Sequence, residues 1–208
     1  VGHHISAGRD AIRDYEYDKA MESLNHALKL SGGDKDAALP LLNLLVETLG
    51  SFHEALNLES SLSLSCLRDE RVRLLLGTAA VNLFEFDRAE KLLLGVENTS
   101  VAGLYVKMAY EMAEKGYEER AERYLRLART LRGGGDLPDG EEVLRKINQL
   151  KAERLRPLED ELLKAHTLGN IDQAKAILQS LLAEFPTSIM GRLVRDEMLE
   201  QERHELRT

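Results

Sequence analysis

Small and apolar residues recur along the chain at fixed offsets, beginning with the stretch YDKAMESLNHALKL from Tyr17 to Leu30. There Ala20 is followed by Leu24 and then by Ala27, a spacing that places all three on one face of a helix. Small side chains on an apolar face indicate that a second helix approaches closely at that point. The stretch therefore predicts an amphipathic helix packed tightly against a neighbour.

The same unit returns along the chain. Its marker alanines stand 35, 34, 32 and 53 residues apart, at Ala20, Ala55, Ala89, Ala121 and Ala174. An apolar residue follows at the fourth position after most of them, with Glu59 as the exception. Twelve residues before the alanines stand Gly8, Asn43, Gly77, Ala109 and Leu162. A period near ~34 residues predicts stacked helical hairpins, and the last interval leaves room for one extra helix.

These features resemble the tetratricopeptide repeat family, a helical hairpin repeat. The resemblance rests on L-G in LLLGTAA, on G-x-x-x-x-A three times, on Y-x-x-A in YDKA, and on F-P in LLAEFPTS with Pro186. It implies antiparallel helix pairs in which the first helix of each pair lines a concave face. The expected fold is all-α: a right-handed superhelical solenoid of about five repeats plus an extra helix and a C-terminal capping helix.

The expected boundaries follow from periodicity and from breaks in it. Helix pairs are predicted at 3–14 with 17–31, 37–49 with 52–65, 70–83 with 86–95, 101–115 with 117–132, and 157–168 with 171–185. The stretch RGGGDLPDG breaks the pattern before an extra helix at 140–155. Pro157 is expected to start a new helix, with one long helix kinked there as the alternative. A terminal helix is predicted at 189–205.

Within one continuous solenoid domain, three parts are expected. Residues 1–135 hold four tetratricopeptide-like pairs, 136–156 hold the Gly/Pro linker and the extra helix, and 157–208 hold the fifth pair and the terminal helix.

Composition narrows the partners. Only 5% of the 208 residues are aromatic, which favours helix over strand. The net charge of −8 argues against a nucleic acid or an anionic membrane as the main partner. No apolar run approaches the ~20 residues that span a bilayer, so no membrane insertion is expected within this chain. The first residue is Val1, which leaves the compartment open: cytoplasmic or, if an upstream signal was removed, periplasmic.

Residues that could bind a metal or a phosphate, or act in catalysis, do not occur at the spacing of known motifs. His53 and Glu54 open HEALN, but the zincin pattern requires a second histidine where Asn57 stands. GGGDLPDG is followed by no Lys-Ser/Thr, so it is not a phosphate-binding loop. Cys66 is the single cysteine and excludes an internal disulfide. We therefore expect no catalytic residues, metal ligands or cofactors, and the chain is not predicted to be an enzyme.

Helical spacing from the core positions gives the residues that would face the groove. They are Arg9, Arg13, Leu44, Glu47, Arg71, Thr78, Asn82, Lys107 and Tyr110. Such a groove is cationic at its first end and suits a peptide or helix with acidic and apolar residues. The alternative is that Arg9 and Arg13 are merely solvated or paired with neighbouring carboxylates. The Lys and Asn pair with which some family members grip a C-terminal carboxylate has no counterpart here.

The sequence thus predicts a non-catalytic protein–protein interaction scaffold that binds a partner's peptide or helix in the concave groove. It would be a module of a larger assembly or secretion apparatus. One alternative is a self-assembly or regulatory module. The other, disfavoured by the acidic balance, is a helical-repeat RNA-binding protein.

Overall fold

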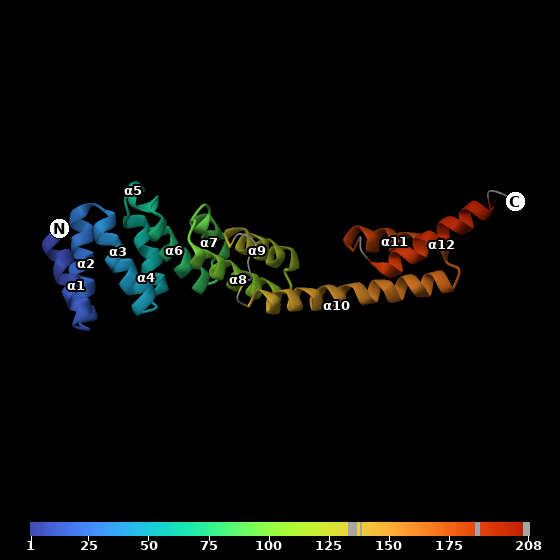
Figure 1. The fold of residues 1–208 in the computed structure, drawn as a ribbon, viewed down its shortest axis with the longest axis horizontal. Coiled ribbons are helices and arrows are strands. Elements are labelled where there is room, and N and C mark those ends of the chain that lie inside the picture. Colours follow the sequence, from blue (N-terminus) through green and yellow to red (C-terminus); the bar gives the residue numbers. More distant parts are fainter. Residues whose placement is uncertain (133–136, 138, 186–187, 206–208) are drawn as a thin grey trace. The chain divides into compact units, whose positions relative to one another are not determined.

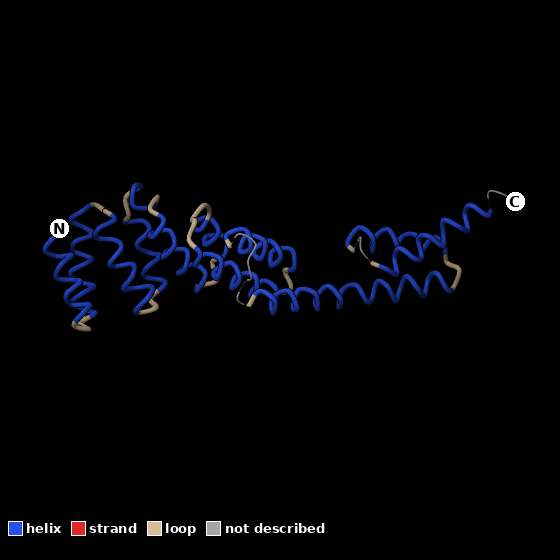
Figure 2. Tube along the Cα trace, in the orientation of Figure 1, coloured by secondary structure: helices blue, strands red, loops and turns tan. Residues whose placement is uncertain are grey.

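A computed structural model describes residues 1–132, 137, 139–185 and 188–205, with side chains as far as Leu199. The described residues form helices and connections, with no strand among them (Figure 2). The expected all-α, tetratricopeptide-like fold is confirmed, while the handedness of the superhelix stays a prediction. The chain divides into two compact units, Val1–Val143 and Leu144–Thr208. Each unit is described by itself.

The first unit is a row of antiparallel helix pairs (Figure 1). The pairs are α1 (Gly2–Arg13) with α2 (Tyr17–Ser31), α6 (Glu70–Asn82) with α7 (Phe86–Leu93), and α8 (Thr99–Glu114) with α9 (Glu118–Leu131). Between the first two lie α3 (Lys35–Asn43), α4 (Phe52–Asn57) and α5 (Leu64–Leu67). The first helices α1, α3, α6 and α8 contact one another in sequence order. They therefore form one continuous wall.

The marker alanines lie where the packing argument requires them. Those of the first unit, Ala20, Ala55, Ala89 and Ala121, are all 0% exposed. A Cβ added to Gly8 would stand 2.6 Å from Cγ of Leu24, and one on Gly77 would stand 2.5 Å from Cδ2 of Leu93. Because real Cβ atoms do not come so close, a larger residue at either position would force the facing leucine to shift. The prediction of close helix contacts at small residues is confirmed.

The turns inside the helix pairs share one backbone conformation five residues before each marker alanine. Three of these positions are glycine, and the other two are Tyr15 and Phe84, both with φ of 60°. The next residue donates its N–H to a carbonyl five positions back, as Glu16 does to Ala11 and Glu85 does to Ala80. This is the Schellman closure of a helix C-terminus, which needs a left-handed residue. The recurring glycines therefore reflect a repeated turn.

The second repeat departs from this rule by one residue. Its first helix ends in a π-helical segment, η1 (Leu44–Thr48), in which Leu49 N–H bonds to Leu44 O at 2.9 Å. The closing bond of the turn runs six residues, from Ser51 N–H to Leu45 O, instead of five. The segment thus accommodates one extra residue, which agrees with the 35-residue interval from Ala20 to Ala55.

That extra residue corrects the expected register of the first helix in this repeat. Spacing assigned Asn43 to the helix contact held by Gly8 and Gly77, but Asn43 is exposed. Leu42, thirteen residues before Ala55, is 0% exposed. An added residue between the two places moves the buried position back by one.

The second helix of this repeat is also shorter than the expected 52–65. It consists of α4, a 3₁₀ segment η2 (Leu58–Ser61), and after a break the short helix α5. The break faces the α2–α3 connection, where Gly33 O accepts from Ser63 N–H at 3.0 Å. A Cβ on Gly33 would lie 2.2 Å from Ser61 O. Two backbone segments meet there, so the chain turns away from helical geometry.

The second unit holds α10 (Gly140–Thr167) from Leu144 onward, together with α11 (Ile171–Glu184) and α12 (Ile189–Glu205). Its core consists of Leu162, Ala165, Ala174, Leu178, Leu181, Val194 and Met198. Helix α10 runs through Pro157 without a break, so the expected helix start at Pro157 is wrong and the single long helix is the correct alternative. Pro186 and most of RGGGDLPDG lie outside the described residues.

The compact units meet after Val143, and the expected division of the chain at 135 and 156 stays a prediction. A single continuous solenoid domain stays a prediction.

Candidate binding groove

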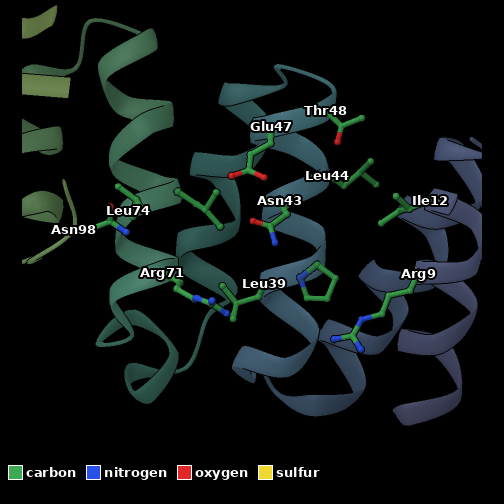
Figure 3. Close-up of a pocket in the computed structure, with 12 residues that line it drawn as sticks. Arg9, Ile12, Leu39, Asn43, Leu44, Glu47, Thr48, Arg71, Leu74 and Asn98 are labelled. Atoms are coloured by element: carbon green, nitrogen blue, oxygen red, sulfur yellow. The ribbon is translucent and has the colours of Figure 1, made fainter. Parts of the chain in front are cut away.

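A pocket opens on the wall of first helices, and we call it the groove pocket (Figure 3). Its volume is about 600 Å³. It is lined from α1 by Arg9 and Ile12, and from α3 and η1 by Leu39, Pro40, Asn43, Leu44, Glu47 and Thr48. From α6 come Arg71, Leu74 and Leu75, and Asn98 follows from the start of α8. Three successive repeats and the N-cap residue of the fourth therefore contribute to one hollow.

The middle of the pocket is mainly apolar. Ile12, Leu39 and Leu74 are half-buried and lie toward the hollow from α1, α3 and α6 (Figure 3). Pro40 lies inside α3 and is buried beside them. A ligand can displace water from the exposed surface of half-buried aliphatic side chains. This displacement favours binding of an apolar group.

Charged side chains flank this apolar floor. Arg9 lies on one side and Arg71 on the other, and Glu47 lies above (Figure 3). Among the described residues, the side chains of Arg9, Arg71 and Glu47 make no hydrogen bond or ion pair. Some other arginines of this unit are paired, as Arg88 is with Glu59 and Arg120 is with Asp87. The two groove arginines are therefore available to external anions.

The extra residue of the second repeat decides which polar group faces the pocket there. Leu44, which spacing places in the groove, lines the pocket but is only 1% exposed. The exposed polar neighbour is Asn43, which sequence reasoning assigned to a helix contact. The signal that could have revealed this is the 35-residue interval, one longer than the next.

A second hollow of about 600 Å³ lies against α8, and we call it the α8 pocket. Lys107 and Tyr110 line it together with Gly103, Val106 and Val143. The Lys107 ammonium donates to Oδ1 of Asn82 on α6 at 2.8 Å. Three of the expected groove residues are therefore close to one another here.

The remaining two expected residues make local contacts. Thr78 Oγ1 donates to Leu74 O at 2.8 Å, one turn earlier on α6. Arg13 pairs with Asp10 at 3.1 Å and lies 3.7 Å from Asp14, and its side chain is 73% exposed. Arg13 lines neither the groove pocket nor the α8 pocket. It fits the alternative of a solvated, locally paired arginine.

Among the described residues, no three His, Cys, Asp or Glu come together in a way that could hold a metal ion. No described helix has the length and apolar character to cross a membrane. Each finding concerns only the part of the chain that the structure describes.

Comparison with known protein families identifies one repeat in the chain. Residues 162–188 match the model of the tetratricopeptide repeat. The match begins at Leu162, twelve residues before Ala174, and covers α11. No curated protein and no solved structure matches the chain. The family match supports the tetratricopeptide-like, degenerate repeats read from the sequence, and it indicates a protein–protein interaction scaffold in general terms.

Proposed function

We propose that the protein is a non-catalytic scaffold that holds a segment of a partner protein in the groove pocket. The segment carries an apolar side chain that covers Ile12, Leu39 and Leu74, with acidic side chains on both sides of it. The observation that supports this is the pair of arginines, Arg9 and Arg71, which flank an apolar floor and form no ion pair with the described residues, although Glu47 lines the same pocket.

Physical chemistry favours this partner over a basic one. A guanidinium binds a carboxylate with two parallel hydrogen bonds, and such charge-assisted bonds are among the strongest between proteins. In a protein with net charge −8, a basic segment would find many competing sites on the surface. An acidic segment is repelled by most of the surface, so a cationic hollow discriminates for it.

Peptide selection from a random library tests the proposal. Dodecapeptides displayed on phage are selected on the purified protein, and the consensus peptide is synthesised with a fluorescent label. The consensus is expected to place acidic residues on both sides of a leucine-like residue. Selection of peptides without such a pattern, or of none, would overturn the proposal.

Charge reversal then locates the site by fluorescence anisotropy. The Arg9→Glu/Arg71→Glu variant is expected to bind the consensus peptide at least about tenfold more weakly, because two charge-assisted contacts become repulsions. Arg13→Glu is the matched control, since Arg13 lies one turn from Arg9 on α1 but outside the pocket. It is expected to leave the affinity nearly unchanged. Equal effects of the two changes would contradict the proposal.

The finer alternatives remain predictions. Membership of a larger assembly or secretion apparatus predicts that the consensus sequence occurs in another component of that assembly. A self-assembly module predicts a mass that rises with protein concentration in light scattering. An RNA-binding protein predicts RNA retention that weakens with salt.

A further inference from the structure

Two of the Schellman turns carry aromatic pairs where other repeats have glycine. Tyr15 and Phe84 take the left-handed conformation at these turns, with φ of 60°. The two residues are 79% and 52% exposed. Bulky residues rarely adopt positive φ, and three equivalent turns use glycine instead. Packing in the core therefore does not explain why Tyr15 and Phe84 occupy these two positions, whereas Phe86, the partner of Phe84, is buried.

The two pairs have almost the same geometry. The Tyr15 and Tyr17 rings lie edge to face with centroids 6.3 Å apart and an interplanar angle of 78°. For Phe84 and Phe86 the values are 6.0 Å and 79°. In such an arrangement the edge of one ring is directed toward the face of the other, and the remaining ring faces carry partial negative charge.

The second pair holds a cation of the chain itself. The Lys115 Nζ lies 5.2 Å from the centroid of the Phe84 ring and 5.6 Å from that of Phe86. Lys115 is the C-cap of α8 and precedes Gly116, the left-handed residue of the next turn. The chain thus contains a complete example of this aromatic pair with a bound alkylammonium group.

The Tyr15–Tyr17 pair lacks that cation. The residue that corresponds to Lys115 is Leu49, which is the C-cap residue of η1 and precedes the left-handed Gly50. Among the described residues, no lysine or arginine lies over either tyrosine ring. Lys19 pairs with Glu16 at 2.7 Å, and so it is engaged elsewhere.

The charge around this pair suits a cation. Asp14 and Asp18 stand next to the two tyrosines in the sequence, and both are exposed. Asp14 lies 3.7 Å from Arg13, a loose contact that an exposed arginine can leave at little cost. An incoming ammonium group would therefore meet two tyrosine rings whose sequence neighbours are exposed carboxylates.

We propose that Tyr15 and Tyr17 form a binding site for the ammonium group of a lysine side chain from a partner protein. The site lies at the α1–α2 turn, and this assignment does not depend on the proposed function of the groove pocket. Lys115 on Phe84 and Phe86 shows the bound arrangement within the same chain.

NMR titration of the tyrosine ring signals tests the site with defined probes. The probes are the blocked tripeptide acetyl-Gly-Lys-Gly-amide and its counterpart with norleucine in place of lysine. The lysine probe is expected to shift the Tyr15 and Tyr17 signals in a saturable way and to bind about two- to fivefold more tightly than the uncharged probe. Equal shifts with both probes would overturn the proposal.

Two reciprocal variants separate the site from general adhesion. Leu49→Lys puts a lysine at the position before the left-handed glycine, as Lys115 is before Gly116, and it is expected to weaken binding of the lysine probe at the tyrosines. Lys115→Leu is expected to open a second site at Phe84 and Phe86, detected by shifts of their ring signals. A Leu49→Lys protein that binds the probe as the wild type does would contradict the assignment.

A third variant removes the pair without disturbing the turn. Tyr15→Gly installs the residue that Gly50 and Gly116 supply at equivalent turns, so the fold is expected to persist by circular dichroism. The lysine probe is expected to lose its preference over the norleucine probe. A preserved preference would show that another surface binds the probe and would overturn the proposal.

Discussion

The Arg88 guanidinium donates to the Glu59 carboxylate from Nε at 3.1 Å and from Nη2 at 2.5 Å, and it joins α7 to the segment that follows α4. Nη2 also donates to Leu56 O at 3.2 Å. The bond with Glu59 raises the pKa of Arg88 above its ordinary value. Glu59 stands where the other repeats place an apolar residue after the marker alanine. An ion pair between repeats therefore replaces an apolar contact.

A double-mutant cycle with Glu59→Gln and Arg88→Met measures this link. Both side chains are about one third exposed, so we expect a coupling free energy of about 0.5–1 kcal/mol in urea unfolding. The pair Asp10 and Arg13 is the control, because both side chains are mostly exposed and lie on one helix. Its coupling is expected to be smaller. Equal couplings would show that Glu59 and Arg88 do not join the repeats.

Two helix glycines should respond to alanine in opposite ways. Gly77→Ala places a Cβ against the buried Leu93, and we expect a loss of about 1–3 kcal/mol in the free energy of unfolding. Gly103→Ala on α8 meets no atom within 4 Å, and we expect a gain of about 0.5–1 kcal/mol from helix propensity. Urea unfolding of both variants provides the measurement. A destabilised Gly103→Ala protein would show that Gly103 also serves packing.

Deletion of Thr48 tests the extra residue of the second repeat. The deletion removes one exposed residue from η1 and allows a regular helix that keeps Leu42 and Ala55 at their contacts. We expect a cooperative unfolding transition close to that of the wild type. Deletion of the exposed Lys107 from the regular helix α8 is the control. It rotates the preceding turns by about 100°, exposes buried residues and is expected to destabilise the unit severely. Similar losses in both variants would refute the insertion.

The Cys66 thiol predicts a loss of stability at alkaline pH. Burial raises its pKa, and the carboxylates of Asp34 and Asp69 add to this effect. Below the pKa of the unfolded chain, both states keep the proton and stability is unaffected. Above about pH 8.5 the unfolded state releases the proton while the folded state retains it, so folding becomes less favourable. The difference between wild type and Cys66→Ala in urea unfolding from pH 7 to 10 isolates this effect. A difference that stays constant with pH would contradict it.

The sequence predicts the helix contacts and turns that recur in each repeat. The marker alanines and the left-handed turn positions recur at fixed offsets, because each helix crossing and each Schellman closure requires a particular small residue or backbone conformation. Helical spacing also places Arg9 and Arg71 on the wall of first helices, because both lie on regular helices. Lys107 and Tyr110 likewise share one pocket as helical spacing suggests.

Other features of the structure could not be predicted from the spacing of residues in the sequence. Leu42 is buried where Asn43 is expected, because the π-helical segment accommodates one extra residue. In the sequence, only the 35-residue interval from Ala20 to Ala55 indicates this extra residue. Glu59 finds its partner 29 residues away, so the sequence shows only a missing apolar residue. Pro157 lies inside α10, where a helix can tolerate one unmade backbone bond. The preference of proline for the first turn of a helix therefore leads to the wrong prediction of a helix start at Pro157.

The π turn beside the groove pocket also has an evolutionary consequence. Glu47 and Thr48 lie on the exposed side of the turn and line the pocket, whereas the buried side of the same helix is set by other residues. Gain or loss of a residue at this place would change the rim of the hollow and leave the interior in place. A lineage could then acquire a new binding preference through a single codon insertion or deletion, without waiting for compensating changes elsewhere.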